Sequence, residues 1–231
     1  MERITELIAG VSEFSGLSDQ ERLELAQVAI RKSYERNEYI AHYGDVWPYL
    51  FVVDTGLINV VKISTKGRIL GALQVQPEQV FWSPTLFDEG PLPAALEVKE
   101  RSSIYLWHGS HILPLVQRNP EALWALCLML MRRIRQASDF IEDLTFQPVA
   151  GRLARLIITQ FEDSADLRIA REQTLDEMAA MIGTTPVMVC KILSRFAGEG
   201  LITVNRTEFE MTDKAALEKI ADLDRGVMSE T

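Results

Sequence analysis

The fold is decided by residues 174–213, TLDEMAAMIGTTPVMVCKILSRFAGEGLITVNRTEFEMTD, in which two short helices precede a hairpin. Thr174 and Glu177 have the spacing of a capping box, which fixes the start of the first helix. Gly183 ends that helix in the left-handed conformation that glycine tolerates best. Apolar residues at helical spacing give both helices one buried face. The pattern therefore predicts a helix-turn-helix.

The second helix of this motif begins at Thr184 or Thr185, either of which can cap it, with Pro186 in its first turn. The stretches 201–204 and 208–211 then predict a two-stranded wing. A winged helix-turn-helix places its second helix in the major groove of DNA. We expect the residues of this motif that contact DNA to be Thr174, Thr184, Thr185, Val187, Lys191, Arg195 and Arg206.

The charge of this region leaves an alternative open, because winged helices also dock proteins. Residues 145–231 carry 14 acidic and 10 basic side chains, and the whole chain has a formal charge of −9. Such a balance argues against non-specific binding of nucleic acid through bulk charge. Lys191 and Arg195 nevertheless place positive charge on the second helix, where phosphates would be met. DNA binding is favoured, and a dimeric sensor whose winged helix docks a protein is the alternative.

A long helix is predicted over residues 119–144, NPEALWALCLMLMRRIRQASDFIEDL, with Asn119 as its N-cap and Pro120 in its first turn. Its apolar or small residues recur at alternating spacings of four and three, which is the seam of a coiled coil. The seam residues are Leu123, Cys127, Leu130, Ile134, Ala137, Ile141 and Leu144. We expect this helix to pair with its copy in a homodimer. The alternative is a buried core helix. Residues 145–148 are expected to break it.

The N-terminal part alternates helical and extended patterns. Residues 4–11 give one amphipathic helix, and Ser18 with Glu21 predicts the capping box of a second. Six short strands are then expected at residues 38–42, 49–54, 57–63, 68–75, 94–98 and 102–107. The turns between them are expected at 44–45, 54–56 and 65–67. Short strands with such turns predict a small antiparallel barrel or roll.

These elements predict an α+β protein in three parts: a β-roll sensor domain over 1–118, a dimerisation helix over 119–144 and a winged helix-turn-helix domain over 145–231. No apolar run approaches the length of a membrane span, and the acidic N-terminus does not resemble a secretion signal. We therefore expect a cytoplasmic protein without a membrane partner, whose two cysteines are free thiols.

Catalysis and resident cofactors are not predicted. The sequence has no glycine-rich phosphate loop, metal-ligand cluster or nucleophile elbow, which argues against an enzyme. An iron–sulfur cluster needs about four cysteine ligands, and only Cys127 and Cys190 are present. Haem is the remaining alternative, through His42, His108 or His111.

The order of roll, long helix and winged helix-turn-helix resembles the Crp/Fnr superfamily of bacterial transcription regulators over nearly the whole chain. Residues 37–75 look like the β-roll of that family, with Gly44, Gly56 and Gly67 at its turn glycines. The resemblance implies a homodimer on a two-fold symmetric DNA site, with a small-molecule effector in the roll. It also makes RNA polymerase a candidate partner.

The effector pocket departs from the cyclic-nucleotide members of the family. Trp82 and Ser83 stand where those members carry a glycine–glutamate pair, and residues 92–94 cover the place of their phosphate-binding arginine. A buried phosphate needs a cation and several donors, so we predict no useful binding of cyclic AMP or cyclic GMP. The pocket is expected to be either self-filled or suited to an apolar ligand. Its candidate residues are Trp82, Ser83, Leu86, Leu92, Arg133 and Ser138.

The recognition helix departs as well. Pro186 and Val187 stand where typical members carry an arginine–glutamate pair, and neither can form bidentate hydrogen bonds to base edges. Val187 can touch a thymine methyl group, and Lys191 matches a later base-reading position of the family. We therefore expect Thr185, Val187 and Lys191 to read bases. The operator should differ from the family's commonest sequence, with more weight on phosphate contacts and DNA shape.

Overall fold

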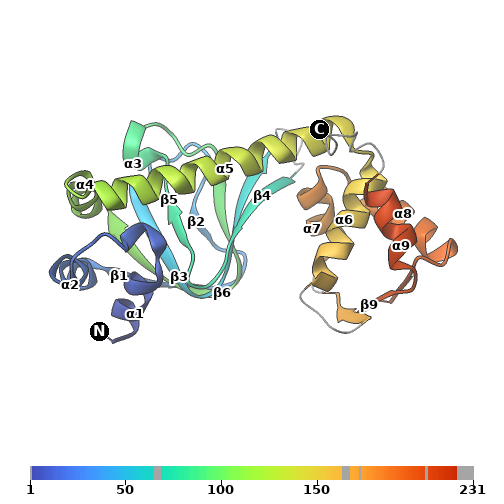
Figure 1. Ribbon diagram of the computed structural model, residues 1–231, viewed down its shortest axis with the longest axis horizontal. Coiled ribbons are helices and arrows are strands. Elements are labelled where there is room, and N and C mark those ends of the chain that lie inside the picture. Colours follow the sequence, from blue (N-terminus) through green and yellow to red (C-terminus); the bar gives the residue numbers. More distant parts are fainter. Residues whose placement is uncertain (1, 65–68, 163–166, 172, 206–207, 223–231) are drawn as a thin grey trace, which may run out of the picture. The chain divides into compact units, whose positions relative to one another are not determined.

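The computed structural model describes residues 2–64, 69–162, 167–171, 173–205 and 208–222. They form two compact units. One comprises residues 2–64 and 71–135, and the other is made mainly of the described residues from 136 to 222. Each unit has its own hydrophobic core. Antiparallel strands and separate helices confirm the predicted α+β fold (Figure 1).

The first unit contains an antiparallel roll. Its strands are β1 (Ile30–Tyr34), β2 (Tyr39–Ala41), β3 (Tyr49–Ile63), β4 (Ile69–Val75), β5 (Val80–Trp82) and β6 (Ala95–His108). The strand order is β1-β6-β3-β4, while β2 pairs with β6 and β5 with β3. The pairings of β6 with β1, β2 and β3 are antiparallel. The predicted turn at Gly44 is confirmed, since Gly44 has a φ of +88° and the Asp45 carboxylate accepts a hydrogen bond from the backbone N–H of His42.

The predicted turn at residues 54–56 is wrong. Residues 49–54 and 57–63 belong to the single strand β3, because the Asp-Thr-Gly signal marks a β-bulge. Residues 95–98 and 102–107 likewise belong to one strand, β6, which begins one residue after the predicted start at 94. Gly56 has a φ of +90°, and a Cβ there would lie 2.6 Å from the carbonyl oxygen of Arg101. The predicted turn at 65–67 lies outside the described residues.

The bulge carries the buried carboxylate of Asp54. Its two oxygens accept hydrogen bonds from Arg3 at 2.9 Å and from Arg31 at 3.1 Å. Arg3 comes from α1 and Arg31 from β1, so one buried acid ties the N-terminal helix and an edge strand to the middle of the roll. A buried carboxylate without such partners would cost several kcal/mol.

Helices cover one face of the roll. They are α1 (Glu2–Gly10), the 3-10 helix η1 (Ser12–Phe14), α2 (Asp19–Val28), the short α3 (Thr85–Asp88) and α4 (Gly109–Gln117). The capping box of α2 is confirmed: the Ser18 hydroxyl accepts from the Glu21 N–H, and the Glu21 carboxylate accepts from the Ser18 N–H.

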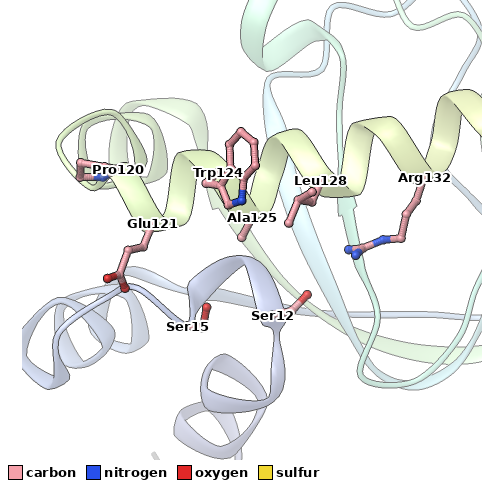
Figure 2. Close-up of a pocket in the computed structure, with 8 residues that line it drawn as sticks. All are labelled: Ser12, Ser15, Pro120, Glu121, Trp124, Ala125, Leu128 and Arg132. Atoms are coloured by element: carbon pink, nitrogen blue, oxygen red, sulfur yellow. The ribbon is translucent and has the colours of Figure 1, made fainter.

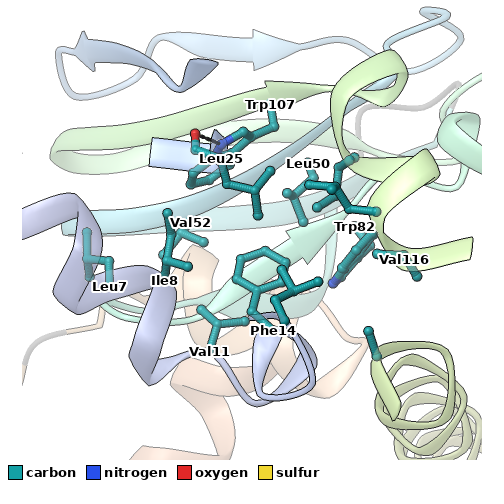
Figure 3. Packing of buried hydrophobic residues seen from close by; sticks show 14 of the residues in the cluster. Leu7, Ile8, Val11, Phe14, Leu25, Leu50, Val52, Trp82, Trp107 and Val116 are labelled. Carbon is teal, nitrogen blue, oxygen red and sulfur yellow. Dashed lines mark hydrogen bonds between the residues drawn. The ribbon is translucent and has the colours of Figure 1, made fainter. Parts of the chain in front are cut away.

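Two cores follow from the alternation of side chains along β3. Leu50 and Val52 face the helices, where they pack with Phe14 and Trp107 (Figure 3). Phe51 and the alternate residues of β3 face the interior of the roll. The buried Trp107 indole donates a 2.8 Å hydrogen bond to the carbonyl oxygen of Leu25 in α2, which fixes that helix on the roll.

A long helix, α5 (Pro120–Phe146), contributes to both units. The predicted N-cap is confirmed, since the Asn119 side-chain oxygen accepts hydrogen bonds from the N–H groups of Glu121 and Ala122. The helix runs two residues beyond its predicted end at residue 144. Thr145 is therefore helical, and its hydroxyl donates to the carbonyl oxygen of Ile141, four residues earlier.

The second unit is a winged helix-turn-helix. It comprises α6 (Val149–Glu162), β7 (Arg168–Ala170), α7 (Leu175–Ile182), α8 (Pro186–Gly198), β8 (Ile202–Val204), β9 (Glu208–Met211) and α9 (Lys214–Ala221). The predicted wing is confirmed as the antiparallel pair of β8 and β9. The segment before α7 contributes β7, a third strand paired with β9.

Candidate functional site

The turn between α7 and α8 has the geometry expected from its sequence. The hydroxyl of Thr174 accepts a hydrogen bond from the Glu177 N–H, and the Glu177 carboxylate accepts one from the Thr174 N–H. Gly183 ends α7 with a φ of +66°. Thr185 is the residue that caps α8, accepting from the Met188 N–H at 3.3 Å. These local bonds set the direction in which α8 starts.

One face of α8 is buried and the other is exposed to solvent. Val189, Ile192, Leu193 and Phe196 belong to the core of the second unit. The exposed face carries Val187, which is 79% exposed, followed by Lys191, Ser194 and Arg195. These four residues share one face because Lys191 follows Val187 by four positions, and Ser194 and Arg195 follow Lys191 by three and four. The structure thus brings the predicted residues Val187, Lys191 and Arg195 together on one accessible surface.

The remaining predicted DNA contacts lie around this stripe. Thr185 is exposed at the N-terminus of α8, Thr184 is half-buried, and Thr174 is exposed at the start of α7. Arg195 lies 3.7 Å from the Glu199 carboxylate, a contact loose enough for a phosphate to replace. Arg206, predicted on the wing, lies outside the described residues.

The seam predicted on α5 faces solvent. Ala122 and Leu126 are the buried side of the helix, whereas Leu123, Cys127, Leu130 and Ile134 are exposed. Further along, Ala137, Ile141 and Leu144 are also exposed. Ile134 is 58% and Ile141 63% exposed, which is costly for large apolar side chains in water.

The end of α5 is locked to α6 and α9 within the second unit. Arg155 donates to both carboxylate oxygens of Asp143, at 2.7 and 2.9 Å, and also to the carbonyl oxygen of Ala221. Leu144 lies so close to the turn glycine that a Cβ on Gly183 would come within 2.6 Å of its Cδ2. The turn between α7 and α8 therefore packs against the C-terminal end of α5.

The predicted effector-pocket residues are not brought together. Trp82 and Leu86 pack into the core between roll and helices, whereas Leu92 is buried inside the roll. The backbone of Leu92 bonds to the turn at Gly44 and Asp45, at 3.0 and 2.9 Å. This contact holds the leucine in the interior.

The polar candidates are also dispersed. Ser138 is exposed on the part of α5 that belongs to the second unit. Ser83 is fully buried. Among the described residues, its hydroxyl, the Trp82 indole N–H and the Thr85 hydroxyl are buried groups without a hydrogen-bond partner. Burial lowers the pKa of the Arg133 guanidinium, and the nearby carboxylate of Glu13 opposes that shift.

One feature was missed at the sequence level. A groove of about 570 Å³ lies between η1 and the first half of α5, where Trp124 and Leu128 form an apolar wall (Figure 2). Ser12 and Ser15 face it from η1. The sequence does contain one indication of this groove, because Trp124 and Leu128 are large apolar residues outside the predicted seam.

Comparisons with protein families agree with this architecture. Residues 31–119 match the model of the cyclic nucleotide-binding domain, and residues 151–220 match that of the Crp-like helix-turn-helix domain. Among the described residues, no helix has the length and apolar content to span a bilayer.

Characterised relatives resemble the chain along most of its length. It is 25% identical to a cyclic AMP receptor protein of Thermus thermophilus, over 90% of this chain and 95% of that protein. It is 22% identical to a CRP-like cAMP-activated global transcriptional regulator of Mycobacterium tuberculosis, over 94% of this chain and 99% of that protein.

A solved structure supports the fold. The structure of the c-di-GMP-responsive global regulator CLP from Xanthomonas campestris superposes with a TM-score of 0.75 at 16% identity, covering 84% of this chain and 99% of that chain. Both family models match the two structural units in the order in which they occur. The chain therefore belongs to the Crp/Fnr superfamily of transcription regulators.

Proposed function

We propose that this protein is a homodimeric regulator that binds a two-fold symmetric DNA site through α8, and whose roll does not bind cyclic AMP or cyclic GMP. The observation that carries the proposal is the exposed stripe of Val187, Lys191 and Arg195 on a helix that is capped at Thr185 and buried on its other face. A helix presented in this way can enter the major groove.

The stripe combines two kinds of contact. Lys191 and Arg195 can bind phosphates or base acceptors, while Val187 at the start of α8 offers only apolar contact, for which the thymine methyl group is the matching partner. Pro186 is half-buried at the first turn and donates no hydrogen bond. We therefore propose an operator recognised by few direct base contacts and by DNA shape.

A selection from random duplexes tests the DNA-binding proposal. A palindrome with half-sites about one helical turn apart is expected. On the selected site, Lys191→Ala should weaken binding by about 1–3 kcal/mol if Lys191 reads a base. Lys219→Ala is the matched control, because Lys219 is an exposed lysine on α9. If Lys191→Ala loses equal affinity for selected and random DNA, Lys191 contacts only phosphate. If the selection enriches no sequence, docking of a protein is favoured instead.

Dimerisation is proposed from the exposed apolar stripe of α5. In a parallel, in-register coiled coil, identical seam residues of the two chains face each other. Cys127 is an exposed thiol on this seam. Oxidation with copper phenanthroline, which takes two electrons from two thiols, should therefore cross-link the chain as a disulfide-bonded dimer. A Cys190→Ser variant should cross-link equally well and Cys127→Ser should not. A monomeric mass in solution would refute the proposal.

The loss of cyclic-nucleotide binding is proposed from the filling of the roll. Phe51 and Phe81 stack there at 5.2 Å, and Leu92 is buried beside them. Among the described residues, the fully buried side chains include no lysine, arginine or histidine that could neutralise a phosphate, and Arg133 is only half-buried. Calorimetry with cyclic AMP and cyclic GMP should show no binding at micromolar concentration. Micromolar or tighter binding of either nucleotide would overturn this part of the proposal and leave the DNA-binding proposal unaffected.

A further inference from the structure

The groove between η1 and α5 lies away from the proposed dimer seam. Trp124, Leu128 and Arg132 follow each other at intervals of four and form one stripe along its wall. Successive residues of an α-helix are about 100° apart, so Leu128 and Arg132 are rotated by about 100° or more from the seam residues Cys127 and Ile134. Trp124 lies about 60° from Cys127, at the edge of the seam. Pairing of two α5 helices along that seam leaves Leu128 and Arg132 accessible and places Trp124 beside the interface.

The walls of the groove are apolar but solvent-exposed. Trp124 is 66% exposed, Leu128 is also exposed, and both lie within one turn on the same helix. A flat apolar molecule that covers them would be stabilised by the removal of this area from water. The volume of about 570 Å³ is in the range of small-molecule sites.

The two ends of the groove carry opposite charges. Figure 2 shows Glu121 at one end and Arg132 at the other, with the Arg132 guanidinium turned back toward the groove. The two residues are eleven positions apart, so their backbones are separated by about 16 Å along the helix. This polarity fixes the orientation of a charged ligand, with an anionic group at the Arg132 end.

Positive charge accumulates at the Arg132 end. Arg132 has no ion-pair partner among the described residues. The next residue, Arg133, has a pKa lowered by burial; the Glu13 carboxylate opposes that shift and the charge of Arg132 adds to it. An anion at Arg132 would relieve the repulsion between the two guanidinium groups. Across the groove, the hydroxyl of Ser15, directly after η1, can donate an additional hydrogen bond, whereas the Ser12 hydroxyl already donates to the Glu13 carboxylate at 2.9 Å.

We propose that this groove is a second ligand site, outside the β-roll, for an amphipathic organic anion: a flat apolar body on Trp124 and Leu128 with a carboxylate on Arg132. Such a ligand would bridge η1 and the first half of α5, which are both in the first unit. The inference does not rest on DNA binding, and it is tested without DNA.

The test is calorimetry of the full chain with 2-naphthoate, and with the neutral 2-naphthylmethanol as the uncharged probe. Naphthoate should bind more tightly. Arg132→Gln should weaken naphthoate about tenfold while leaving naphthylmethanol unchanged, since only the charged hydrogen bond is removed. Trp124→Ala should weaken both. Arg135→Gln is the matched control, because Arg135 is exposed on the same helix but does not line the groove, and it should change neither by more than about twofold.

Three results would overturn the proposal. One is no binding of naphthoate to the wild-type chain at millimolar concentration. Another is unchanged naphthoate affinity in Arg132→Gln, which would place the anion elsewhere. The third is a Trp124→Ala variant that keeps its naphthoate affinity but loses the mass of a dimer, which would assign this face to a subunit contact. Circular dichroism of each variant shows whether it is folded.

Discussion

Substitution of Gly183 by alanine tests how the turn of the helix-turn-helix is held. The glycine has a φ of +66°, and a Cβ added to it would lie 2.6 Å from Leu144 Cδ2. An L-residue in the left-handed region costs about 1–2 kcal/mol. Moving the Leu144 side chain off its rotamer costs about 0.5–1.5 kcal/mol more. We therefore expect Gly183→Ala to destabilise the second unit by about 1.5–3.5 kcal/mol.

The two contributions separate in a double-mutant cycle. With Leu144→Ala in place, the steric part disappears and only the backbone part of about 1–2 kcal/mol should remain. Hydrogen exchange of amides in α7 and α8, measured by mass spectrometry, reports this unit without assuming two-state unfolding of the whole chain. An identical loss in both backgrounds would show that Leu144 does not lie on the turn. A loss below about 0.5 kcal/mol in Gly183→Ala would contradict the left-handed conformation as well.

Three further substitutions test contacts in the two units. The pKa of the Glu21 carboxyl is lowered by hydrogen bonds from the Ser18 N–H and hydroxyl and by Arg118. The resulting stabilisation is present above the ordinary carboxyl pKa and is lost as the pH falls through the lowered pKa. Between about pH 5 and pH 3, the free energy of unfolding in urea should therefore fall less in Glu21→Gln than in wild type. Arg155→Met should cost about 1–3 kcal/mol in α6 exchange protection, since it removes two charge-assisted hydrogen bonds to the Asp143 carboxylate, and unchanged protection would contradict the ion pair. Trp107→Phe should cost about 2–4 kcal/mol in urea unfolding followed by tryptophan fluorescence, from a lost hydrogen bond and a cavity; a loss under about 1 kcal/mol would contradict the buried bond.

Local sequence patterns predicted the helix ends well. The capping boxes at Ser18 and Thr174 and the left-handed end at Gly183 depend on residues within four positions of each other, and all three are present. The same local signals misread Gly56, because a glycine with positive φ serves a turn and a bulge alike. Only the partner strand, some 45 residues away at Ser102, decides between them.

The candidate pocket could not be assembled from the sequence for the same reason. The resemblance to the cyclic-nucleotide members places Trp82 and Leu92, ten positions apart, in one lining. Trp82 faces the helices and Leu92 the interior of the roll, a separation that depends on strand alternation and on the path of the chain through α3. The groove beside Trp124 was missed because its other wall, η1, is more than a hundred residues away in sequence.

The unbroken course of α5 makes its length as important as its composition. One residue inserted after Arg135 would advance the rest of the helix by about 1.5 Å and turn it by about 100°. Ile141 would then leave the line of Cys127 and Ile134. Seven inserted residues would complete close to two turns and restore that line to within about 20°. We therefore expect the chain to tolerate seven residues inserted into α5, which keep the seam on one line, better than a single inserted residue, which does not.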